Sequence, residues 1–221
     1  MQAVIITNDS GVKLPKISKW HNKYGIGKDI TKDCELISLL EMYNLNVPSD
    51  DFINEIDYSE ILKDYIRPTI DMFAGPFNEV RSFLVSINKL VFTKLYVISG
   101  RYGLLNENNK IIPYTTSIKN IKSLKKLDYN TNFRNNMLNV CKNKDIIILL
   151  LPKHFITYLL NINWFDFFKN NQFIFIVSSK NLKSNFIENN YYYLERKGVT
   201  RIGNMNKEII LETIEKIMKE K

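Results

Sequence analysis

Short runs of consecutive apolar residues, separated by longer mixed stretches, predict a sheet whose strands are buried on both faces. None of the runs alternates cleanly with polar residues, as a half-exposed strand would. Long intervals separate most of the runs, so we expect parallel strands joined by crossover connections. The four predicted strands are Ala3–Thr7, Leu95–Ser99, Asp145–Leu151 and Phe173–Ser178.

Apolar residues at helical spacing occupy the stretches between and after these runs. The predicted helices are Cys34–Tyr43, Phe77–Leu90, Asn132–Cys141, His154–Leu160 and Met205–Lys219. This alternation predicts a single α/β domain over residues 1–221, with a mostly parallel open sheet and helices on both faces. The interval from Thr7 to Leu95 is too long for one crossover, so we expect a helical insertion after the first strand, at residues 34–92.

Composition narrows the class of protein. The chain has 221 residues, of which 45% are hydrophobic and 24% are charged, as in ordinary globular proteins. No stretch approaches the roughly 18–20 apolar residues of a membrane span, and the N-terminus resembles a first strand more than a signal peptide. Two cysteines form neither a disulfide framework nor a metal cluster. We therefore expect a cytoplasmic protein that binds no membrane, metal or cofactor.

The net charge of +8 is distributed unevenly along the chain. Residues 1–33 carry a charge of +3, residues 34–80 carry −8, and residues 81–221 carry +13. A basic body of this kind attracts polyanions such as nucleic acid. A genome rich in A and T would produce the same excess of lysine without any such partner. The acidic segment 34–80 instead predicts a docking surface for a protein partner.

Polar residues follow the predicted strands, and the carboxyl ends of parallel strands meet at the edge where open α/β sheets bind ligands. We expect backbone N–H groups in the Ser-Gly-Arg-Tyr-Gly segment to face outward toward a phosphate or carboxylate. A turn, a helix cap or an exposed lysine explains each of these residues without a ligand. The predicted ligand-binding residues are Asn8, Ser10, Lys13, Gly75, Ser99, Gly100, Arg101, Tyr102, Tyr114, Ser178 and Lys180, with Asp9 as the catalytic candidate.

Several familiar catalytic and nucleotide-binding patterns are absent from the sequence. Gly11 and Lys13 do not form a Walker loop, and no G-x-G-x-x-G fingerprint is present. The two histidines, His21 and His154, do not have a metal-ligand spacing with the acidic residues. No Ser-His-Asp or Cys-His arrangement stands out, so the sequence leaves enzymatic activity open.

The segment Tyr96–Leu105, followed by Ile112-Pro113-Tyr114, resembles the YaaA-like family of peroxide-stress proteins and its shorter relatives. These proteins carry a Ser-Gly/Ala-x-Tyr-Gly turn followed by Pro-Tyr, and Phe73–Phe77 looks like their upstream Tyr-x-Gly segment. Weaker likeness extends to Val4–Lys13 and Ser178–Asn189. The resemblance implies an α/β fold with a basic cleft, DNA binding, and a link to nucleic-acid modification.

The first functional hypothesis is therefore a nucleotide- or nucleic-acid-binding protein. In this hypothesis Arg101 binds phosphate, Tyr102 or Tyr114 stacks on a base, and Lys180 completes an anion pocket. If the protein is an enzyme, we expect a hydrolase or transferase that acts on a nucleoside or base, with Asp9 at the base–sugar bond.

The second hypothesis is a non-catalytic protein of stress or defence that binds double-stranded DNA. Its phosphate contacts would come from the lysine-rich C-terminal helix and from Lys119, Lys122, Lys125 and Lys126. A third hypothesis is a scaffold whose acidic segment, residues 34–80, docks a protein partner.

Overall fold

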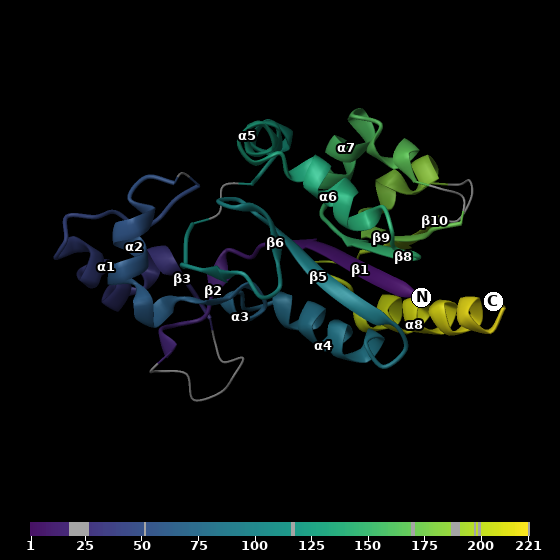
Figure 1. Ribbon diagram of the computed structural model, residues 1–221, viewed down its shortest axis with the longest axis horizontal. Helices are drawn as coiled ribbons and strands as arrows, with labels where there is room; N and C mark the ends of the chain where they lie inside the picture. The colour runs from purple at the N-terminus through teal and green to yellow at the C-terminus, as the bar shows by residue number, and fades with distance from the viewer. Residues whose placement is uncertain are drawn as a thin grey trace.

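A six-stranded sheet lies at the centre of the molecule (Figure 1). The computed structural model describes residues 1–17, 27–50, 52–115, 118–168, 171–186, 191–196, 198 and 200–220. Five strands of the sheet are parallel, and its edge strand β6 runs antiparallel to β5. In spatial order the strands are β10 (Tyr191–Glu195), β9 (Phe173–Ser178), β8 (Ile146–Leu150), β1 (Gln2–Asn8), β5 (Phe92–Ser99) and β6 (Gly103–Asn106).

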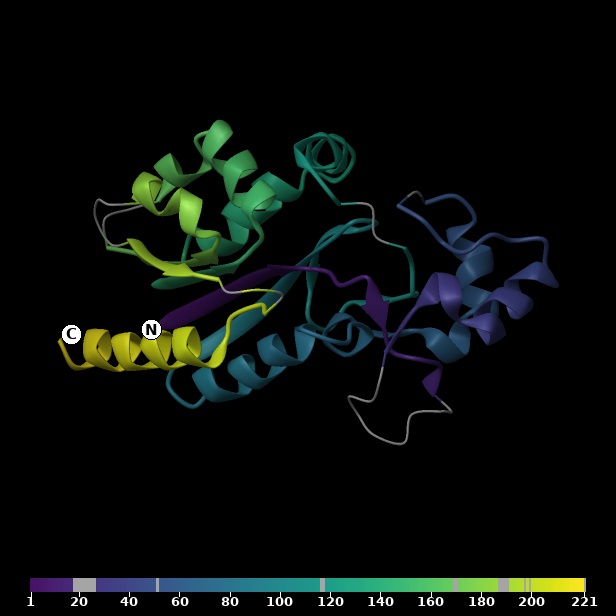
Figure 2. The same ribbon diagram turned by 180° about the vertical axis from the view of Figure 1, so that it is seen from behind.

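Successive side chains of each strand enter two different cores, one on each face of the sheet. In β1, Ala3 and Ile5 belong to one core, whereas Val4 and Ile6 belong to the other. Two helices cover the first core, α4 (Phe77–Ile87) and α8 (Asn204–Lys219). Three helices cover the second core (Figure 1, Figure 2): α5 (Ile121–Thr131), α6 (Phe133–Cys141) and α7 (Lys153–Asn161). The predicted α/β fold, with a mostly parallel sheet between helices, is confirmed.

The elements that the sequence pattern missed are short or weakly buried. All four apolar runs form strands. Strand β6 was not predicted, because it has only four residues and begins at a glycine. Strand β10 is only partly buried, and its three consecutive tyrosines are not typical of a buried strand. Helix α5 was missed because only Leu124 and Leu127 are buried among polar residues.

The chain between β1 and β5 forms additional structure beyond the carboxyl ends of the parallel strands (Figure 1, Figure 2). Its small core contains Leu36, Leu40, Tyr58 and Leu62. These residues come from α1 (Cys34–Glu41) and from α2 (Glu55–Ile61) and its end. Helix α4, by contrast, lies on the sheet.

The remaining elements are short. They are β2 (Val12–Lys13), β3 (Lys28–Asp29), β4 (Arg67–Pro68), β7 (Lys110–Ile111), α3 (Thr69–Met72), and the 3-10 turns η2 (Ile30–Lys32), η3 (Lys63–Tyr65), η4 (Trp164–Phe167) and η5 (Lys180–Phe186). Strands β2 and β3 form one antiparallel pair, and β4 and β7 form another.

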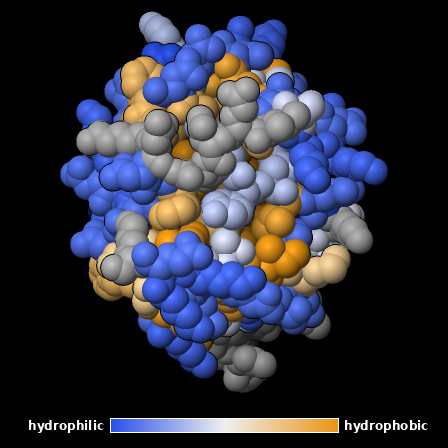
Figure 3. All heavy atoms as spheres, turned by 90° about the vertical axis from the view of Figure 1, so that its right-hand side faces the viewer, coloured by the Kyte–Doolittle hydropathy of each residue, from blue (hydrophilic) through white to orange (hydrophobic). Residues whose placement is uncertain are grey.

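The surface mixes hydrophilic and hydrophobic residues. Figure 3 shows the end of the molecule at which β10 and the last turn of α8 lie, where hydrophobic residues are scattered between hydrophilic ones. Large apolar side chains exposed elsewhere on the described surface include Met42, Ile53 and Ile56 of the chain between β1 and β5. Among the described residues, every helix is too short or too polar to span a bilayer.

Glu79 of α4 caps the N-terminus of α8. The N-cap residue of α8 is Gly203, which has no side chain to accept a hydrogen bond. Glu79 Oε2 instead accepts hydrogen bonds from the backbone N–H groups of Arg201 (3.0 Å), Ile202 (3.1 Å) and Gly203 (3.1 Å). A carboxylate is favoured here because the N–H groups and the helix dipole both present positive charge. This contact joins the two helices on one face of the sheet.

We expect Glu79→Ala to lower the free energy of unfolding by about 1–2 kcal/mol, the usual cost of losing a helix cap. Urea denaturation followed by circular dichroism measures this change. Glu212→Ala is the matched control, because Glu212 is an exposed residue of α8 itself. If the two variants lose equal stability, the cap contributes nothing.

Candidate functional site

The Ser-Gly-Arg-Tyr-Gly segment is the turn of a β-hairpin. Ser99 of β5 pairs with Gly103 of β6, and three residues connect them. Ser99 Oγ accepts hydrogen bonds from the N–H groups of Arg101 (3.1 Å) and Tyr102 (2.9 Å), and Gly100 N–H donates to Asp9 Oδ2 (2.8 Å). These N–H groups are therefore bonded inside the protein. The expectation that they face outward toward a ligand is wrong.

Gly103 shows why this turn needs its second glycine. Its φ of +72° lies in the left-handed region, which side chains other than glycine rarely adopt. A Cβ at this position would also lie 2.6 Å from Cβ of Thr131, the last residue of α5. The glycine thus allows the hairpin to pack directly against α5.

Asp9 connects three segments that are far apart in the sequence. Its side chain, in a residue that is only 3% exposed, accepts hydrogen bonds from Gly100 N–H and from the Tyr114 hydroxyl (2.8 Å), both at Oδ2. Asp9 N–H also donates to the carbonyl oxygen of Ile98 (2.9 Å). Burial, together with the neighbouring Asp9 carboxylate, raises the pKa of Tyr114 well above its usual value. The structure therefore brings the ends of β1 and β5 together with Tyr114.

Arg201 also belongs to this cluster, although no spacing or motif in the sequence marks it. Its guanidinium donates to the carbonyl oxygens of Asn8 (2.7 Å) and Asp9 (2.7 Å), and to Asn8 Oδ1 (2.6 Å). Burial lowers the pKa of Arg201 to about 10. Asn8 was predicted to bind a ligand, but its side-chain oxygen is bonded to Arg201.

Lys13 is a buried cation beside the same cluster. The residue is 1% exposed, and its Nζ lies 4.7 Å from the ring centre of Tyr114 and 5.7 Å from that of Phe73. Within the described part of the chain, Nζ has no hydrogen-bond partner. Burial lowers the pKa of Lys13 to about 8, and the Asp9 and Asp29 carboxylates offset part of this effect. The two aromatic rings add a cation–π interaction to this compensation.

Glu55, the first residue of α2, binds two residues of the hairpin turn at once. Its Oε2 accepts hydrogen bonds from Arg101 Nε (3.0 Å) and Arg101 Nη2, and its Oε1 accepts one from the Tyr102 hydroxyl (2.6 Å). We call Glu55, Arg101 and Tyr102 the latch. It attaches the chain between β1 and β5 to the sheet, and the sequence did not predict the role of Glu55.

The latch changes the roles expected for Arg101 and Tyr102. Arg101 is fully buried, and its Nη1 donates to the carbonyl oxygen of Ser49 (2.7 Å). The Tyr102 ring makes edge contacts with Phe52 and Tyr114, each at 5.7 Å between ring centres. In this arrangement neither residue is open to a phosphate or a base, contrary to the expectation from the sequence.

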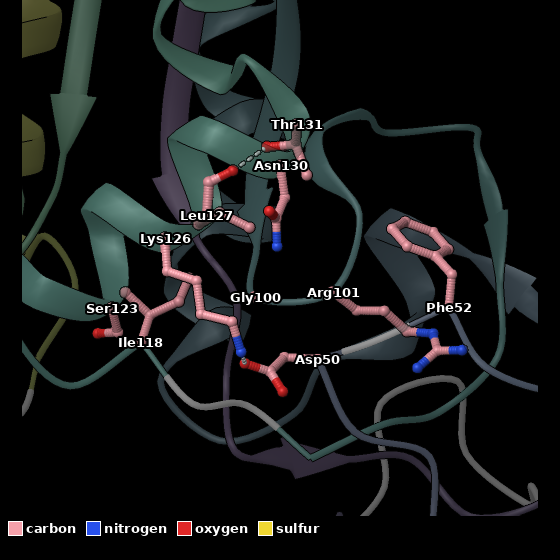
Figure 4. Close-up of a pocket in the computed structure, with 10 residues that line it drawn as sticks. All are labelled: Asp50, Phe52, Gly100, Arg101, Ile118, Ser123, Lys126, Leu127, Asn130 and Thr131. Carbon is pink, nitrogen blue, oxygen red and sulfur yellow. Dashed lines mark hydrogen bonds and ion pairs between the residues drawn. The ribbon is translucent and has the colours of Figure 1, made fainter.

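A cleft opens beside the latch (Figure 4). The cleft is narrow, with a cavity volume of about 20 Å³. Gly100 and Arg101 lie on the hairpin side, while Asp50 and Phe52 come from the chain before α2. Helix α5 supplies the facing residues Ser123, Lys126, Leu127, Asn130 and Thr131, and Ile118 precedes it. Lys126 Nζ reaches across the cleft to Asp50 Oδ2 at 3.6 Å.

The other predicted residues lie apart from this cleft. Ser10 Oγ accepts a bond from Val12 N–H (3.3 Å), and Gly75 is an exposed residue with φ +63° shortly before α4. Ser178 is buried at the end of β9, which β8 separates from β1, and Lys180 is exposed at the start of η5. Of the predicted ligand-binding residues, Gly100 and Arg101 of the hairpin turn line the cleft, and the expected site shared by all the loops does not form among the described residues.

Comparisons with known proteins identify no family for this chain. No protein-family model matches the chain, and no curated protein or solved structure matches it. The likeness to YaaA-like proteins thus stays a prediction from the sequence. Among the described residues, no group of three or more His, Cys, Asp or Glu side chains is placed to hold a metal ion.

We expect Lys13→Met to stabilise the protein at pH 7 by up to about 3 kcal/mol, because it removes a buried charge whose pKa falls from 10.5 to about 8. Between pH 8 and 10.5 the unfolded wild-type chain binds more protons at this lysine than the folded chain does. Wild-type stability therefore rises over this range, and the variant loses this rise. Urea denaturation at several pH values measures both effects. An unchanged pH dependence in the variant would contradict the burial argument.

We expect Glu55→Gln to lower the free energy of unfolding by about 2 kcal/mol, because it leaves the buried Arg101 guanidinium without this counter-charge. The effect is at the lower end for a buried pair, since the Glu55 side chain is 31% exposed. Glu60→Gln is the control, because Glu60 is an exposed residue on the same helix. Equal denaturation midpoints for the two variants would mean that the latch carries no stability.

Proposed function

We propose that the protein binds nucleic acid through its phosphates, with α5 as the contact surface. The observation that carries this proposal is a group of exposed lysines on α5 and directly before it. Lys119, Lys122 and Lys125 are exposed, and among the described residues their ammonium groups take part in no ion pair. Such unpaired cations bind a polyphosphate backbone and release its counterions.

Lys126 supports the same surface. Its side chain is 67% exposed and makes a long contact of 3.6 Å with Asp50. Exposed ion pairs of this kind contribute about 0–1 kcal/mol, so a phosphate can take the place of Asp50 at little cost. Ser123 and Asn130 lie on the same wall and offer hydroxyl and amide groups to a sugar or a phosphate.

The lysines of α8 do not extend this surface. Helices α5 and α8 pack on opposite faces of the sheet, so one straight duplex does not contact both (Figure 1). In addition, α8 carries Glu208, Glu212 and Glu215 against Lys207, Lys216 and Lys219, so its own charge is balanced. The proposal therefore keeps the α5 cluster and leaves the C-terminal helix out.

Chemistry at a base–sugar bond receives less support than binding. Asp9, the candidate catalytic residue, is buried and its Oδ2 accepts bonds from two buried groups. This arrangement suits a carboxylate that positions the hairpin turn and Tyr114. The acidic segment 34–80 as a docking surface for a protein stays a prediction from its charge.

The double variant Lys122→Glu/Lys125→Glu tests the proposal, and the double variant Lys216→Glu/Lys219→Glu is its matched control with the same change of charge. We expect the α5 variant to weaken binding of a fluorescent 20-base-pair duplex by about 10- to 100-fold. We also expect the slope of log K against log salt to fall by about 2, one unit for each lost phosphate contact. We expect the duplex affinity and the salt slope of the α8 variant to stay much closer to those of the wild type.

Fluorescence anisotropy at several salt concentrations gives both quantities, and a single-stranded oligonucleotide and a mononucleotide are run alongside the duplex. If both double variants lose affinity equally, binding depends only on net charge, and α5 is not the contact surface.

A further inference from the structure

We propose that Arg101 and Tyr102 form an oxyanion-binding site that Glu55 occupies from within the chain, and that a phosphate group competes with Glu55 for it. The inference deepens the proposed function and rests on it for the nature of the anion. The Glu55 carboxylate would thus be an autoinhibitory contact.

The donors of the latch are those that recognise an oxyanion. Arg101 directs Nε and Nη2 at one carboxylate oxygen, and the Tyr102 hydroxyl donates to the other oxygen at 2.6 Å. A guanidinium fork with a nearby hydroxyl suits a phosphate as well as a carboxylate, because both present several acceptor oxygens. Arg101 is held in place by Ser49 and by the ring of Phe52, 5.5 Å away. The donors therefore need little rearrangement to accept a different anion.

The position of the latch gives a phosphate access to these donors. Arg101 and Phe52 line the cleft, and Lys126 faces them from α5. A phosphate that contacts Lys126 therefore lies at the same cleft as Arg101, whose guanidinium extends toward Phe52 (Figure 4). The Glu55 side chain is 31% exposed, so solvent and solutes already reach this carboxylate.

The start of α2, which carries Glu55, buries little apolar surface. Helix α2 has seven residues, and its N-cap Asn54 has a φ of +57° and makes no side-chain cap bond. The apolar residues around it, Phe52, Ile53 and Ile56, are 53%, 66% and 77% exposed. So short a helix with so little buried apolar surface near its start opens at low free-energy cost. Displacement of Glu55 therefore needs only a local movement of α2.

The test uses inorganic pyrophosphate as the probe at low salt, with isothermal titration calorimetry. We expect Glu55→Gln to bind pyrophosphate at least ten-fold more tightly than the wild type, because the internal competitor loses its charge. Glu60→Gln is the matched control on the same helix and should bind as the wild type does. The double variant Glu55→Gln/Arg101→Met removes both charges of the pair and should lose the gained affinity.

Two results would overturn the proposal: equal affinity of Glu55→Gln and the wild type, or unchanged tight binding in the double variant. Hydrogen exchange on the wild-type protein covers the case in which Glu55→Gln does not fold. Saturating pyrophosphate should speed exchange of the α2 amides, such as Tyr58 N–H, which donates to the Asn54 carbonyl oxygen (2.9 Å). No change in exchange there would also overturn it. Duplex binding through α5 lysines could still hold, because it is measured with different variants and a different ligand.

Discussion

The hydrogen bonds that converge on Asp9 determine the arrangement of everything around the candidate site. One buried carboxylate oxygen accepts from Gly100 N–H and from the Tyr114 hydroxyl, and so joins the end of β1, the hairpin turn after β5 and the strand-free segment after β7. A buried carboxylate is stable only when such donors replace water. Moving any one of these three segments would leave the carboxylate or its donors unsatisfied, so their relative positions are tightly constrained.

From this cluster outward, the interactions become progressively more exposed. Lys13 is enclosed by aromatic rings, the latch is buried on the Arg101 side and part-exposed on the Glu55 side, and Lys126 stands almost in solvent. Electrostatic interactions weaken in the same order, because solvent screens the outer charges far more than the inner ones. The inner cluster therefore keeps its chain segments in fixed positions, whereas the outer lysines can exchange one anion for another at little cost.

The sequence predicted the sheet well because its central strands are buried on both faces and leave long apolar runs. It also placed Asp9 and the hairpin turn close together, because they follow the neighbouring strands β1 and β5, whereas Ser178 and Lys180 follow β9 and lie apart. It could not predict which of those groups would be bonded to one another. The partners Glu55, Glu79 and Arg201 lie in stretches without a motif, and their roles depend on contacts across 46, 122 and 192 residues of chain. Arg101 was consequently assigned to a ligand, although a carboxylate of the chain itself satisfies it.

Tyr102 has a consequence beyond the latch. Its ring packs against the core that α4 and α8 cover on one face of the sheet. It also packs against the small core formed around α1 and α2. A side chain shared by two cores makes each of them lose packing when the other disorders, which couples their melting. We therefore expect the small core between β1 and β5 to melt together with the core on the sheet, without a separate thermal transition.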